Sequence, residues 1–285
     1  METAMLNIGC GSRFCSESLW TNIDFFSANE RVIACNLLKG IPFPSQTFDV
    51  VYHSHILEHF TKNDAEKLIK ECYRVLKPGG IIRVVLPNLE NICRVYLEAL
   101  EKLTAGHEEW IGKYDWILLE MYDQAVRTVP DGEMGKYLLQ PDIPDREFII
   151  ERAGNMAREK KILKTSTVSS KKSSLWKRAV VKARRTIYNF RRFPSRVRRS
   201  IIESLLDENQ LNALEIGSFR LQGEIHQWMY DRYSLKQLLE KYGFKEVKVC
   251  TAIDSSIKDW DKYLLDINSD GTVHAPASLF MEGVK

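Results

Sequence analysis

The sequence lacks several features that define well-known protein classes. None of its 285 positions begins a run of eighteen apolar residues, so we expect no membrane span. The opening METAMLNIGC has none of the basic, apolar and small-residue zones of a signal peptide, which favours a cytoplasmic protein. The six cysteines form no C-x-x-C pair, which disfavours a zinc ribbon and indicates reduced thiols.

Acidic residues are nearly missing from one segment. Residues 158–199 contain sixteen Lys and Arg and one acid, a net charge of +15, so the rest of the chain carries −12 within a total of +3. Apolar side chains are interspersed with this charge over 175–202. A solvated helical lid, a surface for an anionic membrane or lipid-linked acceptor, and a nucleic-acid arm all fit, and we rank nucleic acid last. Membrane attachment would be peripheral.

Strand-like and helix-like segments alternate at both ends of the chain. Helical spacing of apolar residues predicts helices over 62–76, 89–103 and 233–244, the last beginning at Ser234 and ending at Gly243. The short apolar runs that predict strands are 4–9, 20–26, 31–37, 47–54, 81–87, 245–250 and 278–285. This alternation predicts an α/β fold with a doubly wound sheet.

The middle of the chain does not follow this alternation. We therefore predict a first part of the core over 1–104, an inserted cap over 105–230 and a return to the core over 231–285. The basic segment 158–199 lies inside the cap.

The first strand ends in a turn with two glycines, LNIGCGSRF. Gly9 and Gly11 allow a tight turn and a close approach of a ligand to the backbone. The third glycine of the dinucleotide-binding motif is replaced by Arg13, and no GKS or GKT follows. A loop that binds a pyrophosphate is therefore disfavoured.

The next two strands end in polar residues. Asp24 can accept hydrogen bonds from ribose hydroxyls, and Asn36 with Leu37 suits the amino group and ring face of an adenine. Parallel strands place their carboxyl ends at one edge of a sheet, so these residues predict a nucleoside site there.

Several stretches resemble the class I S-adenosylmethionine-dependent methyltransferases: LNIGCG, NIDF, FDVVYHSHILEHF, ECYRVLKPGGIIRVVLP and YSLKQLLEKYGFKEVKV. The nearest subgroup has its fourth strand followed by an -LEH- motif. The resemblance implies a Rossmann-like seven-stranded sheet of order 3-2-1-4-5-7-6 with the last strand antiparallel, and S-adenosylmethionine as cofactor. Many members carry an acid where this chain has Asn7, and often an Asp where it has Asn36. We expect differently tuned cofactor binding.

Three histidines and a glutamate occur in VYHSHILEHF. The metallo-hydrolase pattern H-x-H-x-D-H is not matched, because this sequence reads H-x-H-x-x-E-H and a following helix would carry His59 elsewhere, so we expect no metal. In the methyltransferase interpretation His53 lies beside the methionine part of the cofactor, while His55, Glu58 and His59 line the acceptor side. His55 is the favoured base for an acceptor hydroxyl. His59 and Glu58 fit equally well as a brace for the helix start.

Further acceptor contacts are expected outside this stretch. His226, Trp228 and Tyr233 form a cluster that either closes over the acceptor or packs the cap onto the core, with His226 as a further catalytic candidate. Asn88 and Asp123 are lesser acceptor candidates.

The function that we expect is O-methylation of a saccharide hydroxyl on a cell-surface or lipid-linked glycan, which rests on resemblance. The first alternative is N- or O-methylation of a small natural product. A non-catalytic adenosyl-binding module with a basic recruitment arm, and a metal-dependent hydrolase, are alternatives of other classes.

Overall fold

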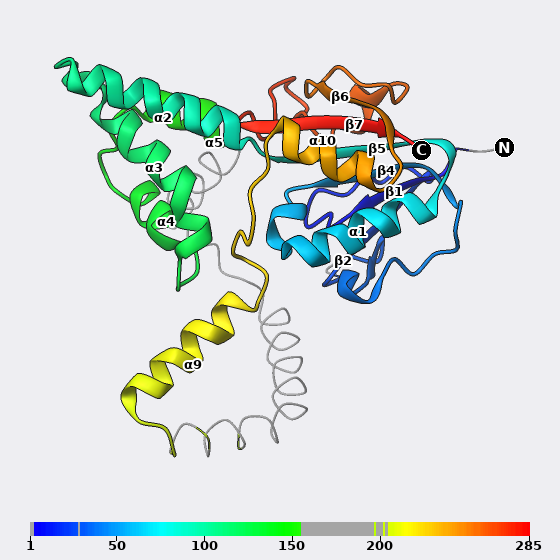
Figure 1. The fold of residues 1–285 in the computed structure, drawn as a ribbon, viewed down its shortest axis with the longest axis horizontal. Helices are drawn as coiled ribbons and strands as arrows, with labels where there is room; N and C mark the ends of the chain where they lie inside the picture. Colours follow the sequence, from blue (N-terminus) through cyan, green and yellow to red (C-terminus); the bar gives the residue numbers. More distant parts are fainter. Residues whose placement is uncertain (1–2, 28, 155–196, 198–201, 203–204) are drawn as a thin grey trace, which may run out of the picture.

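The computed structural model describes residues 3–27, 29–154, 197, 202 and 205–285, and its centre is a single seven-stranded sheet (Figure 1). The strand order is β3-β2-β1-β4-β5-β7-β6, with β7 antiparallel to both neighbours and the other pairs parallel. The strands are β1 (Met5–Ile8), β2 (Trp20–Asp24), β3 (Val32–Ala34), β4 (Phe48–Ser54), β5 (Leu76–Pro87), β6 (Lys245–Cys250) and β7 (Ser278–Val284). The predicted fold class and strand order are confirmed.

Two helices cover one face of this sheet. α1 (Lys62–Val75) begins after Thr61, whose side chain accepts from the Asp64 backbone N–H, and α10 (Arg232–Lys241) begins after Asp231. Their buried residues join the apolar side chains of the central strands in the largest core cluster. The expected start at Ser234 was wrong, because Ser234 is the third helical residue and caps the Asp231 backbone N–H in return.

The segment KPGG belongs to a strand and not to a helix end. β5 already begins at Leu76, which pairs with Phe48, and an irregularity separates this pair from the regular register that resumes at Ile81. Helix α1 therefore ends at Val75, one residue before the predicted end.

The opposite face is covered by the segment 251–277, which includes η4 (Trp260–Tyr263). A buried polar network attaches it: Arg83 Nε donates to Asp266 at 2.7 Å and Arg83 Nη1 to Glu282 at 2.6 Å. Tyr52 donates to Asp266 as well, at 2.6 Å. The crossover 9–19, all of it described, forms turns without a helix, so this face depends on the C-terminal segment for its cover.

After β5 the chain forms helices that lie beside the sheet (Figure 1). The first is α2 (Leu89–Thr104), in the predicted core, and the predicted insertion adds η3 (Glu108–Trp110), α3 (Ile111–Val126), α4 (Gly132–Leu138) and α5 (Arg146–Ala153). α9 (Glu208–Arg220) follows later in the insertion and is drawn apart from the sheet (Figure 1). The basic segment 158–199 lies outside the described residues except for Val197, and the proposed cap boundaries stay a prediction. Within the described part of the chain, no helix combines the length and apolarity needed to cross a bilayer.

Candidate active site

The glycine turn after β1 contains two glycines whose φ angles lie in the left-handed region. Gly9 has φ +64°, and a Cβ there would lie 2.1 Å from Ile56 Cδ1, so a larger residue would collide. Gly11 has φ +53° but no atom within 4 Å of an added Cβ. Glycine at 9 thus serves packing, while glycine at 11 leaves space beside the backbone.

Asn7 holds this turn in place. Its side-chain amide donates to the Arg13 carbonyl at 3.2 Å and to Asn22 Oδ1 at 3.1 Å, and Asn22 in turn donates to the Cys15 carbonyl. Both asparagines are buried. The amide does what a carboxylate could not do, because donation to the Arg13 carbonyl needs an N–H.

Asp24 and Asn36 follow adjoining strands, as the sequence predicts. Asp24 Oδ2 accepts from the Gly11 backbone N–H at 2.7 Å, which ties the end of β2 to the glycine turn. The Asn36 side chain accepts from the Leu38 N–H and caps η1 (Leu37–Lys39). Both side chains are partly exposed, and the carboxylate oxygens of Asp24 keep lone pairs for ribose hydroxyls.

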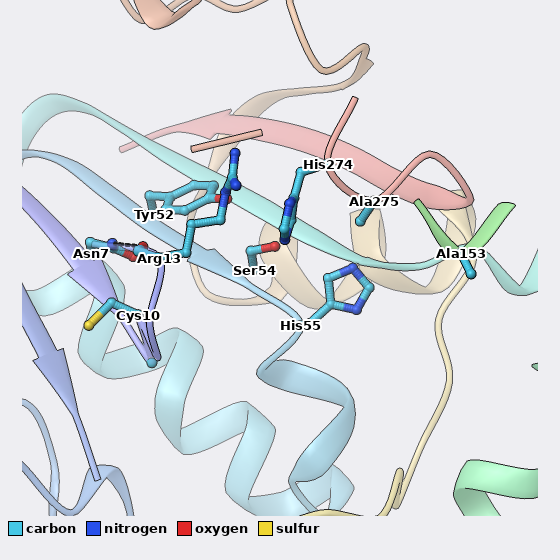
Figure 2. A pocket seen from close by; sticks show the side chains of 10 residues that line it. Asn7, Cys10, Arg13, Tyr52, Ser54, His55, Ala153, His274 and Ala275 are labelled. Carbon is cyan, nitrogen blue, oxygen red and sulfur yellow. Dashed lines mark hydrogen bonds between the residues drawn. The ribbon is translucent and has the colours of Figure 1, made fainter. Parts of the chain in front are cut away.

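A cavity of about 220 Å³ opens between the glycine turn and the carboxyl end of β4 (Figure 2). Arg13 and His274 reach into it from opposite segments, and Arg13 is anchored by hydrogen bonds to the carbonyls of 264, 265 and 267. We call it the glycine-turn cavity; its lining is Asn7, Gly9, Cys10, Arg13, Tyr52, Ser54, His55, Ala153, His274 and Ala275.

His53 does not reach this cavity. Successive strand residues point to opposite faces, and Tyr52 and Ser54 line the cavity while His53 is fully buried on the other side. Burial lowers the pKa of His53 to about 4, partly offset by Glu58, and neither ring nitrogen has a hydrogen-bond partner among the described residues. The structure therefore places His53 outside the lining of the glycine-turn cavity, and its predicted contact with the cofactor stays a prediction.

His55 occupies the boundary of two cavities. Its φ is +54°, a left-handed conformation that non-glycine residues adopt rarely. Its Nδ1 lies 3.2 Å from Glu58 Oε1 and its Nε2 lies 2.9 Å from the Ser278 hydroxyl. The carboxylate favours a proton on Nδ1, which leaves the Nε2 lone pair toward Ser278.

Glu58 is the centre of a histidine–glutamate cluster with His55, His59 and His226. It lies with His59 in η2 (Leu57–His59), directly before the Thr61 cap of α1, and its side chain is fully buried. Burial raises the pKa of Glu58, but the three imidazoles outweigh it and bring the value to about 2. Burial likewise lowers the pKa of His226 to about 3, despite the attraction of Glu58. A charged carboxylate and a neutral His226 coexist at neutral pH.

A second cavity of about 120 Å³ adjoins the first and shares His55, Ala153 and Ala275 with it. Its polar wall includes Glu120, which receives bidentate hydrogen bonds from Arg152 at 2.6–3.0 Å. We call it the cap cavity; its lining is His55, Pro87, Ile92, Trp116, Glu120, Gln124, Met134, Arg152, Ala153, Ala275, Ala277 and Ser278.

Four of the predicted acceptor residues lie elsewhere. Asn88 caps α2 through the Asn91 N–H, and buried Asp123 pairs with Arg127 and accepts from the Glu133 N–H, so both are structural. Trp228 lies under the Lys62 ammonium on the outside of α1, and Tyr233 is 68% exposed. The four side chains line neither of the two cavities, and their role at the acceptor stays a prediction.

Apart from His55, the residues of the cap cavity were missed in the sequence. Trp116, Glu120 and Gln124 recur every four positions in α3, and this face of one helix was the signal that could have found them. Ser278 and His274 carry no local pattern, since only the return of β7 brings them beside His55.

Comparison with known proteins shows a similarity to methyltransferases. The family model of the methyltransferase domain matches residues 6–84, less than half of the chain. The match covers the glycine turn, β2 with Asp24, and β4 with the cluster around Glu58, and S-adenosylmethionine is the cofactor of such domains.

The curated relatives match this chain only in part. The ubiquinone/menaquinone biosynthesis C-methyltransferase UbiE of Vibrio parahaemolyticus is 31% identical over 150 residues, which are 49% of this chain and 51% of that protein. The probable methyltransferase ltbC of Aspergillus luteorubrus is 44% identical over 73 residues, 25% of each chain. The chain thus spans about half the length of the first curated relatives, or less.

A solved structure of an S-adenosylmethionine-dependent methyltransferase from Archaeoglobus fulgidus aligns with 99% of this chain and 86% of its own at 13% identity and a TM-score of 0.38. The fold assignment rests on the strand order given above and not on this distant likeness.

Proposed function

We propose that the protein is an S-adenosylmethionine-dependent methyltransferase that methylates a hydroxyl group in the cap cavity. The observation that carries the proposal is the position of His55, whose Nε2 faces the cap cavity while the same side chain borders the glycine-turn cavity. A base at that boundary stands between a methyl donor on one side and an acceptor on the other.

The residues of the glycine turn and the strand ends fit the cofactor. The open space beside Gly11 admits a ligand close to the backbone, and Asp24 offers a carboxylate for a ribose. S-adenosylmethionine supplies the methyl group when bound. Gly9 and Gly11 allow the turn, and the Asn7 amide holds it, so that its shape is set before the cofactor binds.

His55 performs the proton chemistry in this proposal. Glu58 orients the imidazole through Nδ1, so Nε2 accepts the proton of the acceptor hydroxyl as its oxygen gains the methyl group. The buried carboxylate stabilises the imidazolium that forms, because opposite charges attract strongly where water is excluded. An acceptor hydroxyl would take the place that Ser278 Oγ has beside Nε2.

The chemistry of the cap cavity supports a saccharide as the acceptor. Glu120, Gln124 and Arg152 offer both donors and acceptors, and the Trp116 ring lines the same wall. Several hydroxyls on a compact ring match such a mixture better than an apolar chain does. A small hydroxylated natural product has the same chemistry and remains the alternative acceptor.

C-methylation is a second candidate, favoured by the similarity to proteins named UbiE. It also requires a base to prepare the acceptor carbon, so His55 would serve both reactions. The two are separated by the atom that receives the methyl group in the product, which NMR of a ¹³C-methyl label identifies.

The first test is calorimetric titration with S-adenosylhomocysteine. We expect micromolar binding to the full chain, weakened about tenfold or more by Asp24→Asn, which corresponds to at least about 1.4 kcal/mol. Asp49→Asn makes the same change at the opposite end of the strands and should leave affinity unchanged. No binding by the intact protein would overturn the proposal.

A second experiment distinguishes an effect on the rate of methyl transfer from an effect on cofactor binding. His55→Gln should bind S-adenosylhomocysteine as the wild type does, while methyl transfer to a competent glycoside falls at least about a hundredfold. Transfer at the wild-type rate would remove His55 from the role of base.

A further inference from the structure

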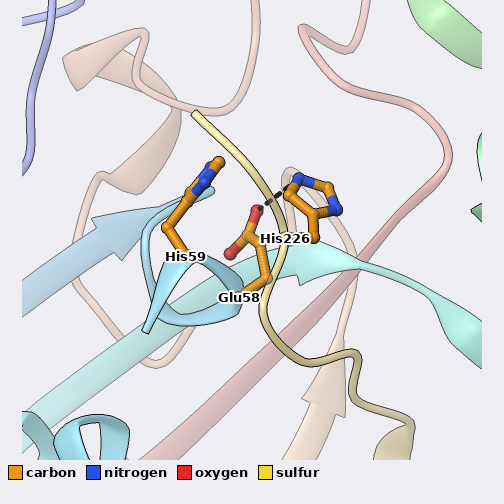
Figure 3. Close-up of side chains that lie close together, drawn as sticks. All are labelled: Glu58, His59 and His226. Atoms are coloured by element: carbon orange, nitrogen blue, oxygen red, sulfur yellow. Dashed lines mark ion pairs between the residues drawn. The ribbon is translucent and has the colours of Figure 1, made fainter. Parts of the chain in front are cut away.

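The histidine–glutamate cluster contains a set of metal-ligand atoms that the proposed methyl transfer leaves partly unused. Glu58, His59 and His226 each offer one ligand atom, and these atoms lie within 4.8 Å of one another. Glu58 and His59 belong to η2, whereas His226 comes from the segment that returns from the inserted helices. Figure 3 shows the Glu58 carboxylate between the two imidazoles.

The buried carboxylate is the second observation that indicates a ligand. Glu58 is fully buried, and the side-chain contact that its carboxylate makes at hydrogen-bond range among the described residues is with His55 Nδ1, 3.2 Å from Oε1. One neutral imidazole leaves most lone pairs of a buried carboxylate unsatisfied, which is costly unless the group is paired with a cation or coordinates a metal. His226 Nε2, also buried, lies 3.9 Å from Glu58 Oε1, a separation that leaves room for an ion between the two.

His59 is already oriented as a ligand. Its Nδ1 lies 3.0 Å from the Ile225 carbonyl, which can only accept, so this nitrogen carries the proton and Nε2 keeps its lone pair. Metal-binding histidines usually donate their other ring N–H to a carbonyl or carboxylate in this way. The rings of His59 and His226 meet edge to face with centroids 4.9 Å apart.

We propose that Glu58, His59 and His226 bind a transition-metal dication, with zinc the best match. Two imidazoles and one carboxylate form the three-ligand set of many zinc sites, with a fourth position left open. Magnesium and calcium prefer oxygen ligands alone and do not suit the set. Ligand atoms around zinc stand roughly 3.3 Å apart in tetrahedral geometry at about 2.0–2.2 Å from the metal, so the longest separation here must close by roughly 1.5 Å.

The ion would join the inserted segment to the sheet. Residues 227 and 228 already donate their backbone N–H groups to the Glu58 carbonyl, at 2.7 and 3.2 Å. A metal bond from His226 to Glu58 and His59 would fix the same junction, directly behind His55 and the cap cavity. This inference concerns metal binding and does not depend on the proposed methyl transfer.

The test is competition for Zn²⁺ between the metal-free full chain and a chromophoric chelator. We expect one Zn²⁺ per chain with a dissociation constant at or below the micromolar range, unaffected by millimolar Mg²⁺. Glu58→Gln and His226→Ala should each weaken binding at least tenfold. His107→Ala, which removes a half-exposed histidine paired with Glu109, is the matched control and should leave affinity unchanged.

Cobalt substitution distinguishes this site from the six cysteines without any variant. Co²⁺ on nitrogen and oxygen ligands gives visible bands without the near-ultraviolet thiolate band, and Zn²⁺ should raise the melting temperature of the wild type. Absence of stoichiometric binding, a thiolate band, or equal affinity in the wild type and the Glu58→Gln variant would each overturn the proposal.

Discussion

At the scale of single residues, two histidines two positions apart have opposite environments. His53 is fully buried with both ring nitrogens unpaired among the described residues, while the His55 side chain is 38% exposed and has a partner at each nitrogen. The strand ends between them, and the positive φ of His55 directs the chain toward η2. One residue is thus kept neutral inside the core and the other is available for proton transfer.

The buried position of His53 predicts a pH dependence of stability. Its folded pKa of about 4 lies below the unfolded value of 6.5, so between these values the unfolded chain binds a proton that the native state excludes. The contribution of neutral His53 to the free energy of unfolding is therefore fully present above pH 6.5. It falls as the pH is lowered toward 4, by up to about 1.4 kcal/mol per pH unit. Urea denaturation between pH 7 and 5 should show this slope reduced in His53→Leu.

The matched change at an exposed histidine, His107→Leu, should keep the wild-type slope, because that side chain is 51% exposed. If His53→Leu and wild type lose stability in parallel, His53 is not the group that titrates.

At the scale of elements, the cover of one sheet face depends on ion pairs. Arg83 in β5 is fully buried and bonds to Asp266 in the segment 251–277, to Glu282 in β7, and to the carbonyls of residues 251 and 254. Residues 9–19 form no helix that could cover this face. The C-terminal segment covers it, and its Trp260 ring packs against the rings of Trp20 and Tyr52. The same segment delivers His274 to the glycine-turn cavity.

Removal of Arg83 should destabilise the packing of the segment 251–277 on the sheet. Arg83→Met leaves two buried carboxylates without their cation, so we expect the free energy of unfolding, measured by urea denaturation, to fall by about 3–5 kcal/mol. Lys77→Met breaks the partly exposed pair with Asp49 and should cost about 1 kcal/mol or less. Similar losses in the two variants would contradict the importance of the buried network.

At the scale of the whole molecule, charge is unevenly divided between a basic segment and an acidic remainder. The +15 of residues 158–199 stands against −12 elsewhere. We propose that this segment attaches the protein to an anionic membrane surface, where a lipid-linked acceptor would be found. Each Lys or Arg near such a surface contributes about 1 kcal/mol at moderate ionic strength.

This proposal predicts salt-dependent cosedimentation with vesicles. The full chain should bind vesicles that contain phosphatidylserine, should not bind neutral phosphatidylcholine vesicles, and should dissociate as salt shortens the Debye length. A variant with Arg184, Arg185, Arg191 and Arg192 changed to Glu should bind more weakly, whereas four Lys-to-Glu changes outside 158–199 should have little effect. Equal binding to neutral and anionic vesicles would exclude an electrostatic attachment.

Local patterns were sufficient for the sheet and for the positions of the strand ends that we propose bind the cofactor. All seven predicted strands are present, and Gly9, Gly11, Asp24 and Asn36 lie at the expected strand ends, because parallel strands bring consecutive carboxyl ends to one edge. The acceptor side depends on longer-range contacts. Trp228 and Tyr233 were candidates as a cluster with His226, and Asn88 and Asp123 were lesser ones; none of the four lines the cap cavity.

The sequence by itself determined the α/β class, the strand order through its resemblance, and the edge of the sheet that we propose binds the cofactor, since hydrophobic period and turn residues act over a few positions. Only the tertiary structure decided that Glu58, His59 and His226 converge, that His53 is sealed off, and that Ser278 faces His55. Those outcomes depend on contacts between segments up to 223 positions apart, which no local pattern specifies.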